Sequence, residues 1–204
     1  MRIYPYSVGE LQANCYLIQE DKNALLVDPG DAASFLLEEV QRQNLTLVGI
    51  LATHGHFDHV MAVGEIQLGI PVPFYIHKKD QFLIDRLEDT AEHFLGHKPI
   101  VIPPSKIKYI SFKTLKIAGF SLNIIETPGH TPGSVCFYFP EEKVIFTGDT
   151  LFAGAIGRTD LSYSNKADMK VSLKKLSALP EEVIVHPGHG EETIIANEIG
   201  STLF

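Results

Sequence analysis

Apolar residues in the first part of the chain fall into short runs that predict strands alternating with helices. The runs rich in Ile, Val, Leu and Tyr are bounded by turn residues, as at Asp28, Pro29 and Gly30. Two other stretches repeat their apolar residues at the spacing of an amphipathic helix. The predicted strands are residues 3–8, 15–18, 24–27, 48–52 and 74–77, and the predicted helices are residues 35–45 and 60–68.

The second part of the chain repeats this order of strands followed by helices. Its predicted strands are residues 107–110, 114–117, 121–126, 134–139, 143–146 and 183–185, and its predicted helices are residues 168–176 and 191–199. Between the two parts, residues 86–105 contain one glycine and three prolines and show no clean period. We expect an irregular segment there, of the kind that often covers an active site.

This repeated order indicates the fold class. Strands followed by helices in each half predict an α/β (α+β) protein in which two mixed sheets pack face to face with helices outside, a four-layer αβ/βα sandwich. No linker, low-complexity tract or heptad run interrupts the chain. We therefore expect a single domain over residues 1–204, with no C-terminal helical domain.

Composition and charge exclude several classes of protein. The 17 basic and 25 acidic side chains give a net charge of −8, and no run of five Lys or Arg occurs. Nucleic acids and anionic membranes require concentrated positive charge, so we expect neither as a partner. The two cysteines, Cys15 and Cys136, cannot form a disulfide framework or a four-thiolate zinc site. Without a signal-like or membrane-spanning stretch, the protein is expected to be cytoplasmic.

A dense histidine cluster carries the strongest chemical signal. Three of the nine histidines fall within the segment His54-Gly55-His56-Phe57-Asp58-His59. Imidazoles and carboxylates are the ligands that hold zinc, iron or manganese. In an extended loop His54 and His56 point the same way, while Asp58 and His59 can point elsewhere as a helix begins. Such a segment can serve two adjacent ions, and the alternative is a surface loop that is merely rich in histidine.

Three further candidates each follow an apolar, strand-like run. They are His130 in TPGHTPGS, Asp149 in FTGDT and His189 in HPGHG. Taken singly, each is explained by ordinary turn chemistry. Because loops at the ends of strands can gather at one edge of a pair of sheets, all three could join the histidine cluster. The combined set has five histidines and two aspartates, enough for two metal sites.

These motifs carry a family resemblance. The segments THGHFDH, TPGHTPGS, FTGDTLF and GHG, in this order over residues 53–190, resemble the metallo-β-lactamase-fold hydrolases, and IGRTD at 156–160 is most similar to the glyoxalase II-like branch. The resemblance implies that His54, His56 and His130 hold one metal, that Asp58, His59 and His189 hold a second, and that Asp149 bridges both. It also implies two transition-metal ions, zinc first and iron or manganese as alternatives.

The chemistry that this resemblance implies is hydrolysis by a hydroxide between the two ions. Two adjacent cations lower the pKa of bound water and polarise a substrate carbonyl. Asp58 is the expected catalytic residue, as a metal ligand that also accepts a hydrogen bond from the nucleophile. The expected partner is a small-molecule thioester such as a hydroxyacyl-glutathione. Complete glyoxalase II enzymes have a C-terminal helical domain that helps to grip glutathione, so the acyl group and thiol carrier are left open.

Two other functions fit the same motifs. Persulfide dioxygenases resemble the chain in the same segments but use one iron, held by residues that match His54, His130 and Asp149. A metal-dependent structural or binding protein is the third class. True β-lactamases of the best-known zinc type are disfavoured, because they place a cysteine where Asp149 stands. Metal analysis of protein purified without added metal would separate the two enzyme classes.

Residues outside the implied ligand set receive weaker predictions. Arg158 is expected either to anchor a substrate carboxylate through its planar fork or to form a surface ion pair with Asp160. Phe57 and Phe152 are candidates for the pocket wall or the core, and the core is the expectation for Phe152. No partner is assigned to the remaining histidines, His77, His93, His97 and His186, although the last is expected to be structural.

Overall fold

The structure, a computed structural model, describes residues 1–199, and its first sheet is built from the first half of the chain. The strands lie in the order β1-β2-β3-β4-β5-β6, antiparallel from β1 to β3 and parallel from β3 to β6. Their bounds are β1 Arg2–Val8, β2 Ala13–Glu20, β3 Asn23–Val27, β4 Thr46–Leu51, β5 Phe74–His77 and β6 Ile107–Ile110.

The second sheet is built from the second half of the chain. Its order is β14-β13-β10-β9-β8-β7, and β10 and β13 are the parallel pair. The bounds are β7 Thr114–Ile117, β8 Phe120–Glu126, β9 Val135–Phe139, β10 Val144–Gly148, β13 Ile184–Pro187 and β14 Thr193–Ile194. A small hairpin of β11 Leu151–Phe152 and β12 Ala155–Ile156 follows β10.

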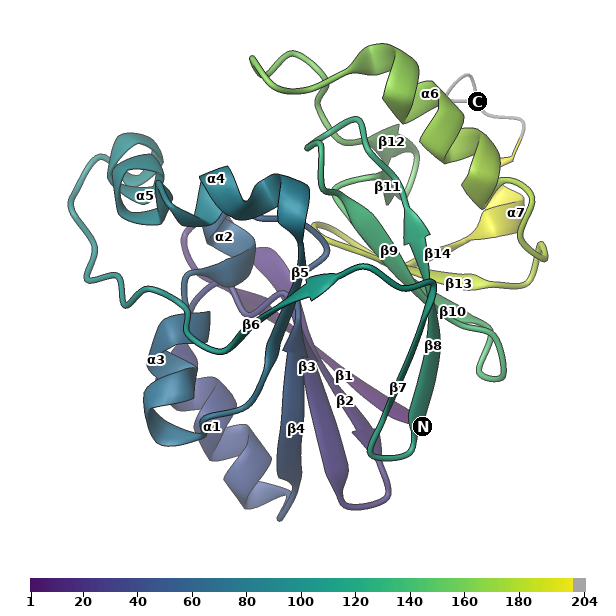
Figure 1. Ribbon diagram of the computed structural model, residues 1–204. Coiled ribbons are helices and arrows are strands. Elements are labelled where there is room, and N and C mark those ends of the chain that lie inside the picture. Colours follow the sequence, from purple (N-terminus) through teal and green to yellow (C-terminus); the bar gives the residue numbers. More distant parts are fainter. Residues whose placement is uncertain (200–204) are drawn as a thin grey trace.

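Helices cover the outer face of each sheet, which confirms the four-layer sandwich (Figure 1). The first sheet is covered by α1 Ala33–Arg42, α2 Phe57–Val60, α3 Val63–Gly69 and α5 Leu87–Leu95, with η1 Lys78–Asp80 and α4 Gln81–Ile84 after β5. The second sheet is covered by α6 Lys166–Leu176 and α7 Ile195–Glu198. Side chains from the facing surfaces of both sheets, Phe137 and Leu25 among them, form the central core.

The sequence of the two longest helices explains where they form. In α1 the buried residues Ala33, Leu36 and Val40 recur at three- and four-residue steps, so one face packs on the sheet. The longest helix, α6, is capped by Asn165, the residue before its first turn. The Asn165 side chain accepts hydrogen bonds from the backbone N–H groups of Ala167 and Asp168. Both helices therefore agree with the predicted periodicity, with ends shifted by a few residues.

Two predicted segments differ from the structure. Residues 86–105 were expected to be irregular, but α5 occupies Leu87–Leu95, because Leu87 and Ala91 bury one helical face before Gly96 ends the helix with a positive φ. The helix predicted over 191–199 is instead the short strand β14 followed by α7. Pairing with β13 outweighs helical periodicity there. The predicted domain also includes residues 200–204, which lie outside the described residues.

The ends of several strands meet where the two sheets come together. Asp28 follows β3, the histidine segment follows β4, Asp149 follows β10 and His189 follows β13. This arrangement brings motifs from both halves to one edge of the sandwich. Within the described part of the chain, no helix has the length and apolar character needed to cross a membrane.

Candidate metal centre

Three histidine side chains from two loops meet at one point. His54 and His56 follow β4, and His130 lies between β8 and β9. Nδ1 of His56 lies 3.1 Å from Nε2 of His54 and 3.0 Å from Nε2 of His130. We call these three residues the first triad. One nitrogen from each lies within 4.8 Å of the other two.

Hydrogen bonds behind the first triad determine which ring nitrogens carry hydrogen. Nδ1 of His130 donates to the backbone carbonyl of Arg158 at 2.9 Å. Nδ1 of His54 lies 3.1 Å from the hydroxyl of Thr53, which donates its own hydrogen to a buried carboxylate and must accept from the ring. Because Nδ1 of each ring donates to these groups, the Nε2 atoms of His54 and His130 face Nδ1 of His56.

A second triad lies beside the first. Asp58 and His59 are on α2, and His189 follows β13. The Nε2 atoms of His59 and His189 are 3.3 Å apart. Oδ2 of Asp58 lies 3.6 Å from Nε2 of His59 and 3.4 Å from Nε2 of His189. Nδ1 of His59 donates to Oδ2 of Asp28 at 3.1 Å, which leaves its Nε2 facing the triad.

The position of His189 depends on the other sheet. Asn14 of β2 donates to the carbonyl oxygens of Pro187 and Gly190 at 3.1 and 2.9 Å. The Tyr16 hydroxyl, also on β2, donates to the Pro187 carbonyl at 2.6 Å. These bonds hold the loop after β13 against the first sheet, so a residue from the second half joins ligands from the first.

Asp149 lies between the two triads. Its Oδ2 is 3.4 Å from Nε2 of His130, and its Oδ1 is 3.4 Å from Nε2 of His59 and 3.8 Å from that of His189. Within residues 1–199, this Oδ1 is the buried side-chain oxygen that has no hydrogen-bond partner. A buried carboxylate oxygen without a partner is costly unless a cation satisfies it.

The spacing of these atoms fits metal coordination. In a tetrahedral site with bonds of about 2.0–2.1 Å, ligand atoms lie about 3.3 Å apart. The separations of 3.0 to 3.8 Å around Asp149 are close to that value. A third cluster, Asp28 with His54 and His59, also exists, but the Asp28 oxygens are already used by Thr53 and His59.

The two triads differ in charge. Burial, together with the neighbouring histidines, lowers the pKa of His54 well below its usual range, and burial lowers the pKa of His56 to about 3. Burial would also lower the pKa of His59, but the carboxylates of Asp58 and Asp149 raise it to about 10. His54 and His56 of the first triad are therefore neutral, while Asp58 and His59 of the second triad carry opposite charges.

A buried carboxylate behind the first triad connects the loops that carry its histidines. Asp80 is fully buried and accepts hydrogen bonds from the backbone N–H of Gly55 at 2.9 Å and of Gly133 at 2.7 Å. It also accepts one from the Thr131 hydroxyl at 2.7 Å. Gly55 lies between His54 and His56, and Thr131 follows His130. Asp80 therefore fixes the relative position of the two loops.

The close approach of the backbone to the triads requires glycine at one position. A Cβ atom on Gly188 would collide with Oδ1 of Asp149 and lie 2.8 Å from Cε1 of His59. Any side chain at position 188 would therefore displace the second triad or Asp149. The glycine of HPGHG is a steric requirement of the site rather than only a turn residue.

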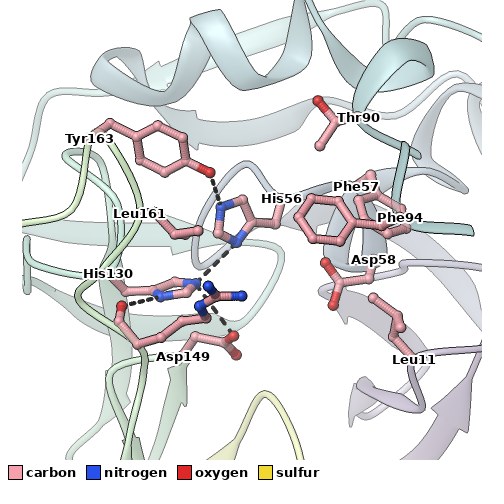
Figure 2. A pocket seen from close by; sticks show the side chains of 11 residues that line it. Leu11, His56, Phe57, Asp58, Thr90, Phe94, His130, Asp149, Leu161 and Tyr163 are labelled. Atoms are coloured by element: carbon pink, nitrogen blue, oxygen red, sulfur yellow. Dashed lines mark hydrogen bonds and ion pairs between the residues drawn. The ribbon is translucent and has the colours of Figure 1, made fainter. Parts of the chain in front are cut away.

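A pocket of about 140 Å³ opens beside the triads (Figure 2). Figure 2 shows Asp58, Phe57, Phe94 and Leu11 along one side of it and Tyr163, Leu161 and His130 along the other. The residues of both triads that line it are His56, Asp58 and His130, together with Asp149. A small molecule in this pocket would therefore lie directly against the candidate ligands.

Two polar side chains complete the pocket wall. The Tyr163 hydroxyl is 2.7 Å from Nε2 of His56. Arg158 lines the pocket, yet its Nε and Nη2 atoms donate to the two carboxylate oxygens of Asp160 at 2.9 and 3.0 Å, with the arginine side chain 56% exposed. The structure thus contains the ion pair that was one of the two expectations for Arg158, and its role as a substrate anchor stays a prediction.

The structure brings together all seven residues that the resemblance implied as ligands: His54, His56, Asp58, His59, His130, Asp149 and His189. Sequence reasoning missed the residues that hold them, Asp28, Thr53, Asp80 and Tyr163. Asp28 offered a weak signal, because it follows a predicted strand as the ligand residues do. Asp80 and Tyr163 offered none.

The histidines without an expected role lie apart from both triads. His77 accepts a backbone hydrogen bond from Lys79, and His93 and His97 are exposed on and after α5. His186 is buried and stacks on Phe146, as expected for a structural residue. Phe57 is buried and also lines the pocket, while Phe152 is half-buried.

Comparisons with known proteins agree with this geometry. A family model, the metallo-beta-lactamase superfamily, matches residues 8–189. Hydroxyacylglutathione hydrolase GloC from Haemophilus influenzae is 37% identical over 207 residues, which cover 100% of this chain and 98% of that protein. Two solved structures are also similar. The BLEG-1 B3 metallo-beta-lactamase has 35% identity and a TM-score of 0.90, with coverage of 97% and 96%. TTHA1623 in a di-iron-bound form has 37% identity and a TM-score of 0.88, with coverage of 97% and 98%. The chain therefore belongs to the metallo-beta-lactamase superfamily.

Proposed function

We propose that this protein is a dinuclear metal-dependent hydrolase that cleaves a thioester such as a hydroxyacyl-glutathione. The observation that carries the proposal is the pair of triads that share Asp149 at the floor of one pocket. The relative named hydroxyacylglutathione hydrolase, which matches the whole chain, supports the substrate class.

In this proposal each triad holds one transition-metal ion. His54, His56 and His130 would hold the first, Asp58, His59 and His189 would hold the second, and Asp149 would serve both. Zinc is the expected metal, and iron is an alternative that the di-iron form of a similar protein supports. The bound ions would supply a nucleophilic hydroxide at neutral pH and polarise the thioester carbonyl.

The side chains of the chain itself contribute charge and orientation. Burial would raise the pKa of Asp58, but the neighbouring His59 and His189 lower it, so the carboxylate stays ionised. An ionised Asp58 at the pocket wall can accept a hydrogen bond from the attacking water and fix its direction. If His56 coordinates through Nδ1, its Nε2–H donates to the Tyr163 oxygen, and the phenol hydrogen is left to donate into the pocket. A thiolate leaves without strong acid catalysis, so no separate proton donor is needed.

One experiment tests this proposal against the mononuclear alternative. The protein is purified without added metal, its metal content is determined by elemental analysis, and turnover of lactoyl-glutathione is measured. Two ions per chain and release of free thiol are expected. A single iron per chain, with oxygen uptake on glutathione persulfide, would instead show a persulfide dioxygenase in which His54, His130 and Asp149 hold the iron.

A further inference from the structure

Two large apolar side chains are exposed at the mouth of the pocket. Leu11 lies in the turn between β1 and β2 and is 43% exposed, and Phe94 lies on α5 and is 52% exposed. Both line the pocket that contains Asp58 and Asp149. The two segments are neighbours. Nε2 of His97, which follows α5, lies 3.8 Å from Oε1 of Glu10, which precedes Leu11. Distant parts of the sequence thus supply apolar groups to one place.

These side chains continue into an apolar surface that reaches the candidate metal ligands. The Phe94 ring stacks on Phe57, with centroids 5.9 Å apart and planes at 20°. Phe57 immediately precedes Asp58. A second, smaller hollow also contacts Leu11 and Phe57 and is lined further by Met61 and Leu95. We call Leu11, Phe57 and Phe94 the apolar wall (Figure 2).

The opposite side of the pocket carries Leu161 and polar side chains that already have partners. Arg158 is paired with Asp160, and the Tyr163 hydroxyl contacts His56. The attacked carbonyl carbon of a thioester carries two arms, the acyl group and the sulfur. A hydrophilic thiol with a carboxylate suits the side of Arg158 and Tyr163. The acyl group then points toward the apolar wall.

We propose that the preferred substrate is a thioester whose acyl group carries an apolar or aromatic substituent, bound against Leu11, Phe57 and Phe94. This inference rests on the proposed function, and it specifies the acyl group that the function leaves open. A substituent of this kind covers the exposed ring of Phe94 and the side chain of Leu11, which removes apolar surface from water. A methyl substituent is too small to reach both.

The test compares two substrates that differ only in the acyl group. S-mandeloylglutathione replaces the methyl group of S-lactoylglutathione with a phenyl ring, while the thiol arm stays the same. We expect kcat/KM to be about tenfold or more higher for the mandeloyl thioester, the scale of discrimination that an apolar pocket provides. In Phe94→Ala and Leu11→Ala this preference should fall several-fold, and in the double variant it should nearly vanish.

Val171→Ala is the matched control, since Val171 is 59% exposed on α6 and is absent from the residues that line the pocket. This variant should keep the wild-type preference. Equal kcat/KM for both thioesters in the wild type would overturn the inference and leave the proposed function standing. A preference that survives in the double variant would also overturn it, because another surface would then hold the phenyl ring. No hydrolysis of either thioester would overturn the proposed function, and the inference with it.

Discussion

The two triads face the same pocket but are supported in different ways. In the first triad the outer nitrogens of His54, His56 and His130 contact two hydroxyl groups and a backbone carbonyl, all uncharged. In the second, His59 is backed by the carboxylate of Asp28. The difference extends to solvent exposure, since the His130 side chain is 3% exposed and that of His189 is 30% exposed. The histidines of the first triad are backed by uncharged groups, whereas the second triad contains a carboxylate of its own and is backed by another.

This difference indicates that the two triads depend on different interactions for their geometry and for metal binding. A site built from histidines alone depends on hydrogen bonds to its rings for its geometry, so loss of these supports should disturb it most. A site with its own carboxylates attracts a cation directly and depends more on its ligands themselves. Four substitutions break or sharpen this contrast.

Replacing Asp58 should have the largest effect, because it removes a ligand and the only carboxylate that belongs to the second triad alone. We expect Asp58→Ala to stay folded, to lose one of its two metal ions, and to hydrolyse thioesters several orders of magnitude more slowly. Elemental analysis and kcat measurements check both effects. Asp85→Ala, which removes an exposed carboxylate after α4, is the control and should behave as wild type. Full turnover in Asp58→Ala would show that the second triad has no part in catalysis.

Replacing Asp80 tests whether the first triad depends on its supports. Asp80→Ala leaves two backbone N–H groups and the Thr131 hydroxyl without their buried acceptor. Each such loss costs about 1–3 kcal/mol, so the metal-free protein should lose roughly 3 kcal/mol or more of its free energy of unfolding. Urea unfolding of metal-free protein measures this. Metal titration with a competing chelator should then show weaker binding at one site, while the other is nearly unchanged. Equal weakening at both sites would contradict the contrast between the triads.

Tyr163→Phe is a smaller change on the same triad, since it removes the hydroxyl that contacts His56 and keeps the ring against Phe82. Loss of an outer partner of a metal ligand typically costs about tenfold to hundredfold in metal affinity or activity. The same chelator titration measures the affinity. Tyr109→Phe is a suitable control, because its hydroxyl bonds to Gln81 outside the pocket. An unchanged affinity in Tyr163→Phe would mean that His56 is positioned by the backbone alone.

Arg158→Ala should have the smallest effect on the triads, because His130 donates to the backbone carbonyl of Arg158, which the substitution leaves in place. If the guanidinium anchors a carboxylate of the thiol arm, KM should rise about tenfold to hundredfold while kcat is nearly unchanged. Arg158→Lys should recover only part, because an ammonium lacks the fork. The ion pair with Asp160 predicts little kinetic change. A rise in KM that is the same for a thioester without that carboxylate would refute the anchor.

The sequence predicts the ligands better than it predicts their supports. Four candidate ligands lie within six residues, and the others sit in short motifs directly after apolar runs, so local spacing carries the information. Asp80 gains its function only from contacts with Gly55 and Gly133, which lie 25 and 53 residues away. No local pattern can encode such a contact. The same reason applies to Tyr163, which lies 107 residues from His56.

Errors in the predicted elements also have local causes. Residues 86–105 contain a glycine and three prolines after position 95, and these turn residues outweigh the helical spacing of Leu87 and Ala91 when the segment is judged as a whole. At residues 191–199 periodicity indicates a helix, but Thr193 pairs with Val185 in a short strand that precedes α7 along the chain. The sequence predicts the two mixed sheets of the sandwich correctly, because each sheet is formed by one continuous half of the chain.

That continuity has a consequence for how the two halves stay together. Each triad takes two ligands from the half before residue 111 and one from the half after it, and Asp149 also belongs to the second half. A metal ion bound in either triad would therefore link the two halves of the chain. A ligand whose free concentration is a thousand times its dissociation constant stabilises the state that binds it by about 4 kcal/mol. A chain cut between β6 and β7 would yield two fragments that each lack a complete coordination set, and added metal should strengthen their reassembly.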